Sequence, residues 1–286
     1  LTRIAMIKPI PPYPALLVVN KNERTLVVAD LHIGWEVPLT KEGVHVPSQT
    51  AKLQEKLFKI IKKVKPRTVL FLGDVKHTIA KAEVEEWKDI PEFFEALTRI
   101  VKEILVIPGN HDGNLEPLLP ESVKILPSTG IKIKNTGVFH GHTWPSPELL
   151  ECKNLVIGHL HPVVVLRDPL GFKITSQVWV KEKCNSVKLA EALLKKVHGK
   201  AGDNSIETFR EIFHKIPRTS QIFVMPAFND FLGGQPVNVS SVGKEEKYRD
   251  FIGPILRSRT INMDDAEIYM LDGTFLGTIH QLRMLA

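Results

Sequence analysis

Five short motifs of Asp, His, Asn and Gly, most of them directly after an apolar run of strand length, constrain this chain more than any other feature. A strand that ends in a polar residue places that side chain at the carboxyl edge of a sheet, where α/β proteins collect ligands. One such ending is ordinary, but five endings with metal-binding side chains predict one site assembled from five loops. The motifs are Asp30-Leu31-His32, Gly73-Asp74, Gly109-Asn110-His111-Asp112, His140-Gly141-His142 and Gly158-His159-Leu160-His161.

The order of the apolar runs predicts an α/β fold. After a hairpin with strands at 15–19 and 25–30, helix and strand alternate, which indicates crossovers between parallel strands; the elements are a helix near 48–65, a strand at 68–73, a helix at 91–102 and a strand at 104–107. Short strand-like runs then follow near 123–126, 130–133, 137–140, 154–158, 163–166 and 176–180. This change indicates a second, mostly antiparallel sheet packed on the first.

The C-terminal third bears on domain organisation. Residues 186–216 have a helical pattern interrupted by the polar stretch 199–204, and strand-like runs return at 221–224, 266–271 and 274–279. Because strands resume after the helices, we expect one domain over 1–286, with 186–216 as a helical insertion and 217–286 returning β-structure to the core. A domain boundary near 181–186 is the alternative.

Composition restricts the class of protein. Hydrophobic residues make up 43% of the chain and charged residues 24%, as in ordinary globular proteins. No apolar run approaches the ~20 residues that a membrane helix needs. Near the N-terminus, prolines interrupt any apolar signal segment; they are Pro9, Pro11, Pro12 and Pro14. We therefore expect a cytoplasmic protein without a membrane partner.

Charge and cysteine content are less specific. The net charge of +6 and the pI of about 9.2 are compatible with a polyanionic substrate but do not require one. Lysines cluster between Lys52 and Lys65 beside a helical apolar stripe, so we interpret them as a solvated helix face in preference to a nucleic-acid patch. Cys152 and Cys184 form no Cys-x-x-Cys pair and are interpreted as two reduced, buried thiols.

The five motifs together resemble the calcineurin-like metallophosphoesterase superfamily. Its blocks D-x-H, G-D, G-N-H-D/E, a His after a strand, and G-H-x-H all occur in this order between Asp30 and His161. The resemblance implies a two-sheet β-sandwich flanked by helices, a four-layer arrangement. Residues 30–36, 73–77 and the later Pro226-Ala227-Phe228-Asn229 resemble one branch, the archaeal SbcD-related and bacterial ligase-associated DNA-repair phosphoesterases.

The ligand types favour intermediate divalent ions. Carboxylates and imidazoles without cysteine suit Mn²⁺, Fe²⁺ or Zn²⁺. The resemblance implies two ions, with Mn²⁺ preferred and Fe²⁺, Zn²⁺ or Ni²⁺ as alternatives. Two divalent ions bring +4 and two Asp carboxylates return −2, so the site keeps about +2 and attracts a phosphate. By resemblance, one ion is bound by Asp30, His32, Asp74 and His161, and the second, bridged by Asp74, by Asn110, His140 and His159.

Several site assignments have alternatives. His140 directly follows its strand and is preferred as the ligand, which leaves His142 near the substrate or behind the ligands. Asn110 is otherwise a helix cap before Leu115. By resemblance, His111 faces the phosphate and the leaving group, where it stabilises charge or protonates the departing alkoxide. Asp112 is expected to orient its loop.

One departure from the superfamily pattern concerns the residue that orients His111. Many relatives carry an acid three residues after the Asp of the Gly-Asp motif, and this chain has His77 there. The sequence therefore leaves the orienting partner open. Neighbouring Lys76 is interpreted as an exposed loop lysine in preference to a phosphate contact.

Aromatic residues follow two of the motifs. Trp35 and Trp144 stand where they would stack on a base, but loop packing is the preferred interpretation. A loop with Phe228, Asn229 and Gly233-Gly234 either lies near the site or is a plain turn.

These observations predict a dinuclear metal-dependent phosphoesterase in which a metal-bridged hydroxide attacks phosphorus and His111 assists the leaving group. The expected substrate is a phosphodiester, with DNA or RNA suggested by the branch resemblance. The alternatives are an enzyme for a small nucleotide or cyclic phosphodiester, and a non-catalytic metal-binding scaffold. Scaffolds tend to lose ligands or the catalytic His, and this chain keeps all of them.

Overall fold

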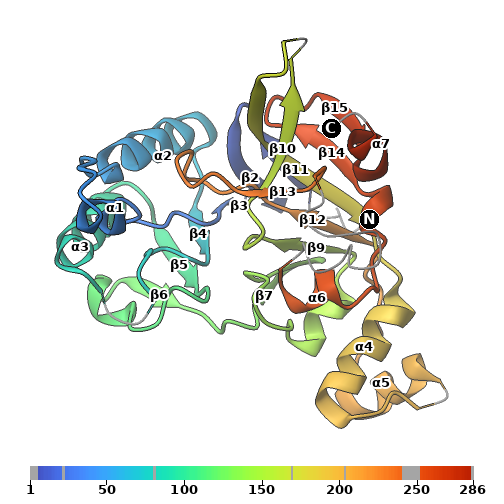
Figure 1. Cartoon of the computed structure of the whole chain (residues 1–286). Coiled ribbons are helices and arrows are strands. Elements are labelled where there is room, and N and C mark those ends of the chain that lie inside the picture. The colour runs from blue at the N-terminus through green and yellow to red at the C-terminus, as the bar shows by residue number, and fades with distance from the viewer. Residues whose placement is uncertain are drawn as a thin grey trace.

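Two sheets form the centre of the molecule in the computed structural model, and helices cover their outer sides (Figure 1). The structure describes residues 6–20, 23–79, 82–168, 170–202, 204–239 and 252–284. This mixed α/β architecture, with two multi-strand sheets flanked by helices, confirms the fold class predicted from the sequence.

The first sheet has the strand order β1-β2-β3-β4-β5-β6. Strands β1 to β3 are antiparallel, and β3 to β6 are parallel. Helices α2 and α3 connect the parallel strands, as the alternating pattern predicted. The elements are β1 (Met6–Ile10), β2 (Tyr13–Asn20), β3 (Glu23–Val28), α1 (Val37–Lys41), α2 (Thr50–Val64), β4 (Thr68–Leu72), α3 (Val84–Thr98), β5 (Glu103–Ile107), η1 (Glu116–Leu118) and β6 (Val123–Ile125).

The second sheet has the order β13-β10-β11-β12-β9-β8-β7, and β14 and β15 extend it from β11. Strand β9 is parallel to β8 and β12, β13 is parallel to β10, and the other pairs are antiparallel, as expected. Its elements are β7 (Ile131–Ile133), β8 (Thr136–Val138), η2 (Pro147–Glu151), β9 (Asn154–Ile157), β10 (Pro162–Arg167), β11 (Lys173–Lys183), β12 (Gln221–Val224), β13 (Gln235–Pro236), η4 (Met263–Asp265), β14 (Glu267–Met270) and β15 (Phe275–Thr278).

Apolar packing divides the structure into four layers. Between the sheets, Val27 and Leu70 of the first sheet pack with Val156 and Trp179 of the second. Helices α2 and α3 bury their apolar stripes on the outer face of the first sheet, and α4 (Ser186–His198), α5 (Ser205–Phe213), α6 (Pro254–Arg257) and α7 (Ile279–Arg283) pack against the second. Strand β4 is buried along its whole length, which explains why its sequence is continuously apolar.

Helix α2 has the two faces expected from its sequence. Leu53, Leu57 and Ile60 are buried and most of its lysines are exposed, which confirms the apolar stripe and the exposed lysine face. Lys56 is the exception, because its Nζ donates to the Phe228 carbonyl and pairs with Asp230, each at 2.7 Å. This lysine therefore links the loop after β12 to helix α2. The preference for a solvated face over a nucleic-acid patch stays a prediction.

Helix α3 begins earlier than the sequence predicted. It starts at Val84 instead of residue 91, and Pro91 lies inside it. Glu83 and Glu86 form a reciprocal capping box that fixes the true start. The predicted start at 91 left these capping residues outside the helix.

The predicted helical stretch 186–216 is formed by α4 and α5, with the break near 199–204. The two helices pack on each other, and α4 contacts η2. The single-domain organisation with this stretch as an insertion stays a prediction. Among the described residues, no helix is long and apolar enough to cross a membrane.

Candidate metal centre

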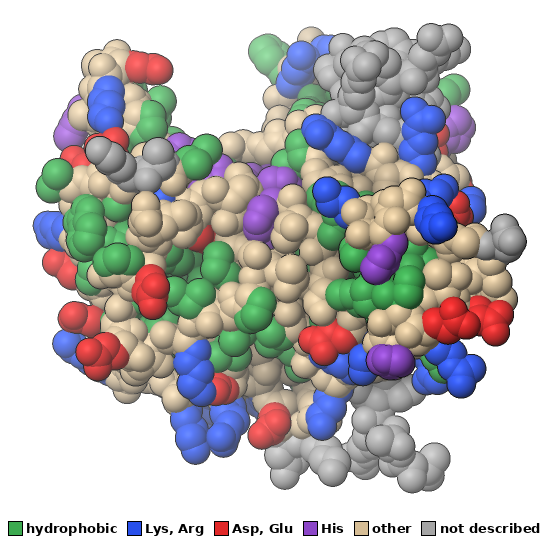
Figure 2. Space-filling model, turned by 90° about the horizontal axis from the view of Figure 1, so that it is seen from below, with side chains coloured by type: hydrophobic (Ala, Val, Ile, Leu, Met, Phe, Trp, Pro, Cys, Tyr) green, Lys and Arg blue, Asp and Glu red, His purple; other side chains and the backbone are tan. Residues whose placement is uncertain are grey.

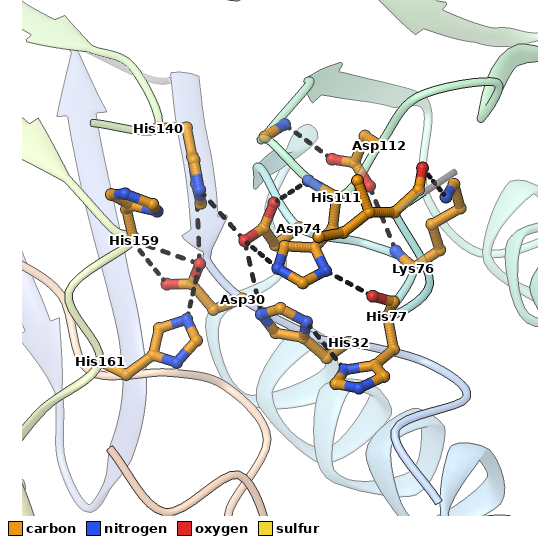
Figure 3. A network of polar contacts seen from close by, with 12 residues as sticks. Asp30, His32, Asp74, Lys76, His77, His111, Asp112, His140, His159 and His161 are labelled. Carbon is orange, nitrogen blue, oxygen red and sulfur yellow. Dashed lines mark hydrogen bonds and ion pairs between the residues drawn. The ribbon is translucent and has the colours of Figure 1, made fainter. Parts of the chain in front are cut away.

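The ends of β3, β4, β5, β8 and β9 meet at one edge of the two sheets, and their loops face one another (Figure 3). Three of these strands belong to the first sheet and two to the second. In Figure 2, histidine side chains reach the surface near the middle of the face, while Lys and Arg are scattered among acidic residues. This face therefore exposes histidines without a continuous basic surface in the part that the structure describes.

A first group of four side chains lies where the resemblance placed one ion. Ligand atoms of Asp30, His32, Asp74 and His161 all lie within 4.8 Å of one another. The His161 Nε2 atom is 3.2 Å from Asp30 Oδ1, and His32 Nε2 is 3.5 Å from Asp74 Oδ2. Both imidazole nitrogens are buried and take no hydrogen bond among the described residues. Two carboxylates with two imidazole nitrogens aimed at them fit a divalent ion.

A second group shares Asp74 with the first. Asp74, His140 and His159 also offer ligand atoms within 4.8 Å of one another. The Nε2 atom of His140 is 3.3 Å from Asp74 Oδ2, is buried, and has no hydrogen-bond partner in the described part of the chain. The same Asp74 oxygen therefore lies near one imidazole of each group, the position that a bridging ligand occupies.

The remaining two candidates lie at the rim. Asn110 is exposed on the loop between Gly109 and His111, a loop that lies against Asp74. The His142 ring lies 5.2 Å from the His140 ring and belongs to neither group of His and Asp side chains. The geometry thus brings His140 to the centre and leaves His142 next to it.

The backbone is bent at the ligands. Asp30, His32, Asp74, His159 and His161 all have positive φ angles, between 45° and 67°. This left-handed conformation is uncommon for residues other than glycine and is sustained at functional sites by surrounding contacts. Its repetition at five candidate ligands indicates that the loops are shaped for the site.

The motif glycines are required by close approach. A Cβ atom at Gly73 would stand 2.1 Å from His140 Nδ1, and one at Gly109 would stand 2.1 Å from Asp74 Oδ1. No side chain fits at such distances. The glycines of these two motifs therefore allow the two sheets' ligands to meet.

Hydrogen bonds select the ring nitrogen that His140 presents. Its Nδ1 lies 2.9 Å from the Leu72 carbonyl oxygen and donates to it. The proton on Nδ1 leaves Nε2 as the lone-pair atom facing Asp74. His140 therefore has the tautomer of a metal-ligating histidine.

Burial and charge set the protonation of the cluster. Burial lowers the pKa of His32 to about 3 and that of His159 to about 4, so both are neutral ligands near pH 7. Burial also opposes the charged form of His140, but the neighbouring carboxylates of Asp74 and Asp30 raise its pKa to about 9. The two carboxylates thus attract positive charge into the centre.

The ionised form of Asp30 and Asp74 prevails although both are buried. Burial opposes ionisation of Asp30, but His161 and His140 together outweigh it and hold the pKa of this carboxyl below its ordinary value. The neighbouring His140 imidazole likewise lowers the pKa of Asp74 against the opposing effect of burial. Backbone N–H groups assist, since His159 N donates to Asp30 Oδ2 and His111 N to Asp74 Oδ1.

The orienting partner of His111 is a backbone carbonyl. His111 Nδ1 donates to the carbonyl oxygen of His77, and its Nε2 lies 4.0 Å from Asp74 Oδ2. The His77 ring has another contact, because its Nδ1 is 3.3 Å from Nδ1 of His32. His77 therefore supports His111 through its main chain and His32 through its side chain. The three rings also offer ligand atoms within 4.8 Å of one another.

Asp112 joins two ligand loops. Its Oδ1 accepts from the backbone N–H of Val75 at 2.8 Å and of Lys76 at 3.2 Å, and its Oδ2 accepts from Gly109 at 2.8 Å. The carboxyl is buried, and burial raises its pKa to about 6. This geometry matches the expected loop-orienting role.

Lys76 differs from the sequence interpretation. It is fully buried instead of exposed, and its Nζ donates to the backbone carbonyls of Thr78 and Ile79. The loop folds back over the lysine, so the ammonium satisfies carbonyls that would otherwise lack a donor. The prediction of an exposed loop lysine was wrong.

Two further residues support the site: Glu86 was not assigned to it from the sequence, and the loop with Asn229 was left as either near the site or a plain turn. Glu86 on α3 is buried, and its Oε1 accepts from the N–H groups of His77 and Thr78 at 3.0 and 2.8 Å. Asn229 is also buried and donates to the Leu31 carbonyl at 2.9 Å. The Glu83-x-x-Glu86 capping pattern was the available signal for the first, and the Phe228-Asn229 motif for the second.

The aromatic residues beside the motifs pack within the protein. Trp35 stacks on Phe231 with ring centroids 5.7 Å apart and planes at 10°. Trp144 packs against the core of the second sheet. The packing interpretation is therefore confirmed for both.

Comparison with known protein families concerns the part of the chain that carries the motifs. Residues 23–199 match the family described as calcineurin-like phosphoesterase. This range contains every candidate ligand, from Asp30 to His161. No curated protein matches the chain significantly.

Two solved structures are similar at low identity. The nuclease MPE of Pseudomonas putida is 16% identical, with 93% of this chain and 98% of that chain covered and a TM-score of 0.47. The phosphoesterase Yfce of E. coli is 18% identical, with 50% of this chain and 73% of that chain covered and a TM-score of 0.32. At these values neither likeness bears on the chemistry of this chain.

Proposed function

This chain belongs to the calcineurin-like phosphoesterase family, and from that premise we propose that it hydrolyses phosphodiesters with two divalent metal ions bound side by side. The family makes it a metal-dependent hydrolase of phosphate esters. The proposal adds the number of ions, their ligands and the diester substrate.

The observation that carries the proposal is the position of Asp74. One of its oxygens lies 3.5 Å from His32 Nε2 and 3.3 Å from His140 Nε2, so it belongs to both ligand groups. Buried imidazole nitrogens without partners are unfavourable unless a ligand satisfies them. Asp30, His32 and His161 would hold one ion with Asp74, and the second would be held by Asp74, Asn110, His140 and His159.

The ions, when bound, supply Lewis acidity toward the phosphoryl oxygens and activation of water. The protein supplies the charge balance. Because only Asp30 and Asp74 return negative charge, about +2 remains to attract an anionic ester, as counted from the ligand set. Mn²⁺ is the preferred ion, because carboxylate and imidazole donors without thiolate suit it.

His111 acts on the leaving group. The His77 carbonyl accepts a hydrogen bond from Nδ1, which orients the ring. Nε2 then carries the proton that can pass to the departing oxygen. The ring is only partly buried, so a substrate oxygen can reach it.

The proposed substrate class is nucleic acid. Its support is the resemblance of the first, second and late motifs to DNA-repair phosphoesterases, together with the net charge of +6. A small nucleotide or a cyclic phosphodiester is the second candidate, since a two-metal centre acts on many phosphate esters.

The test combines metals with substrates. Purified protein would be assayed with Mn²⁺, Fe²⁺, Zn²⁺, Ni²⁺ and Mg²⁺ on aryl phosphate mono- and diesters, then on labelled single- and double-stranded DNA and RNA. We expect metal-dependent cleavage of the diesters and of an oligonucleotide, abolished in Asp74→Asn. Intact oligonucleotides alongside turnover of a cyclic dinucleotide would move the substrate to the second candidate. A lack of hydrolysis with every metal would refute the proposed activity.

A further inference from the structure

A second hollow lies outside the metal centre, between the hairpin β10–β11, the segment 236–239 and helix α7. It has a volume of about 480 Å³. Its walls carry Val165, Thr175, Pro236, Asn238 and Val239, and three cations line it, Arg167, Lys173 and Arg283. Among the residues that the structure describes, no carboxylate lines this hollow. Its composition therefore suits an anion with an apolar part.

Two of the cations oppose each other across the hairpin. Arg167 on β10 and Lys173 on β11 are directly paired in the antiparallel register. Like charges in this position destabilise a sheet unless an anion lies between them. The nearest acid in sequence, Asp168, is turned into the hairpin loop, where its Oδ1 accepts from the N–H groups of Leu170 and Phe172 at 2.9 Å each. It is thus engaged in the turn.

The third cation, Arg283, forms part of the wall of the hollow. Arg283 Nη1 pairs with Asp264 at 2.6 Å, and its side chain is only 15% exposed. Its Nε is buried and has no hydrogen-bond partner among the described residues. A buried guanidinium N–H without an acceptor is unfavourable, and a phosphate oxygen is an acceptor that guanidinium groups bind strongly.

The hairpin face that forms the hollow continues to the metal centre. Val165 and Thr175 are paired across the hairpin, and the next pair on the same face is Val163 and Gln177. The Gln177 Nε2 donates to the carbonyls of Ala227 and Asn229. Gln235 N donates to the His161 carbonyl beside the start of β10. From His161 to Arg167 the strand rises roughly 20 Å at about 3.3 Å per residue.

We propose that this hollow binds a backbone phosphate of a nucleic acid whose scissile diester lies at the metal centre. The inference rests on the proposed function and extends it with a second contact several nucleotides away, since one strand of a duplex advances about 3.4 Å per nucleotide. The hairpin extends beyond the body of the second sheet (Figure 1). Next to Lys173, Phe172 is 67% exposed, and an exposed aromatic ring beside cations is suited to stacking on a base.

The test removes Arg167 and Lys173 as cations and measures how the affinity for an oligonucleotide depends on salt. The double variant Arg167→Gln/Lys173→Gln would be compared with Lys188→Gln/Lys196→Gln, which removes the same charge from α4 on another part of the molecule. Fluorescence anisotropy without added metal would follow a labelled single-stranded oligonucleotide from low to high salt. We expect about tenfold weaker binding and a salt slope shallower by roughly 0.7 for the hairpin variant alone.

A third variant addresses the buried donor. Arg283→Lys keeps the charge and removes Nε, so we expect weaker binding of the oligonucleotide and a salt slope close to that of wild type. Thermal unfolding of each variant would show whether the fold is retained. Hydrolysis of a small aryl diester should be unchanged in all three, because that substrate does not reach the hairpin.

Three results would overturn the inference. One is an unchanged affinity and salt slope in Arg167→Gln/Lys173→Gln. Another is an equal loss in the α4 control. The last is inorganic phosphate or a mononucleotide binding to the hollow as tightly as the oligonucleotide does, which would make it a site for a free anion. If the wild-type protein hydrolyses no diester, the proposed function fails, while the metal-free binding comparison still decides the role of the hollow.

Discussion

The two sheets contribute different chemistry to the same centre. Loops of the first sheet carry both carboxylates, Asp30 and Asp74, with His32. Loops of the second sheet carry only imidazoles, from His140, His159 and His161. The negative charge and the bridging position thus belong to one sheet and the neutral donors to the other. Neither sheet alone presents a complete ligand group.

The largest expected effect comes from the first sheet. Asp74→Ala removes the only side chain common to both groups, so we expect loss of both ions and a decrease in activity on the order of 10⁴. Metal analysis of the purified variant, with wild type alongside, is the measurement. A variant that keeps close to two tightly bound equivalents would show that the site is not bridged by Asp74.

The next effect separates chemistry from binding within the first sheet's loops. His111→Ala should retain its metal and lose kcat by ~10²–10⁴, because the proposed mechanism assigns His111 to the leaving group and its Nε2 lies 4.0 Å from Asp74. Metal content and kcat are measured together. Loss of metal with activity would make His111 a ligand, and full activity would remove it from the mechanism.

A single imidazole of the second sheet should matter less than Asp74. His159→Ala removes one donor of the second group and leaves the first group complete. We expect about one equivalent of metal to remain and activity to fall by about 10². Titration calorimetry with Mn²⁺ would test this. Equal loss of both ions would contradict the prediction that a second-sheet imidazole matters less than Asp74.

His77 offers a finer test, because its ring and its carbonyl serve different partners. In His77→Ala the carbonyl that holds His111 is retained, and the ring contact to His32 is lost. We therefore expect roughly tenfold weaker binding of one ion and a kcat within about threefold of wild type at saturating metal. A large fall in kcat at saturating metal would contradict this division.

The smallest expected effect is a pH dependence of stability. In the metal-free protein, the pKa of His140 is raised to about 9 from 6.5, so its stabilisation is complete below pH 6.5 and is lost as pH rises through 9. Bound ions take the place of this proton, so the metal-loaded protein should not lose the stabilisation. The difference in melting temperature between metal-loaded and metal-free protein should therefore grow by a few degrees as pH rises from 6.5 to 9. His140→Gln is the control that should lack this change.

Much of this arrangement could be predicted because the candidate ligands directly follow strands. An apolar run followed by Asp30 or Asp74 defines a strand end by local pattern alone, so the sheet edge and its residues follow. The start of α3 was placed too late, because it depends on the reciprocal capping contacts of Glu83 and Glu86.

What could not be predicted depends on contacts between distant segments. The partner of His111 is a main-chain carbonyl, which every residue type carries, so the identity of His77 gave no information about it. Lys76 was misjudged because its burial follows from the path of the loop after it. Asn229 contacts Leu31 although the two are nearly two hundred residues apart along the chain, and sequence periodicity does not predict contacts at that separation.

The bent ligand loops are held by the protein's own hydrogen bonds. Asp112, Glu86 and Asn229 each tie a ligand loop to a neighbouring segment, so the left-handed turns at Asp30 and Asp74 are stabilised by polypeptide contacts. A metal site whose loops are already held by such hydrogen bonds needs little reorganisation when an ion binds or leaves. Ions should therefore exchange without unfolding the loops, and in a mixture the occupant would follow supply and intrinsic affinity more than any shape that the protein adopts around it.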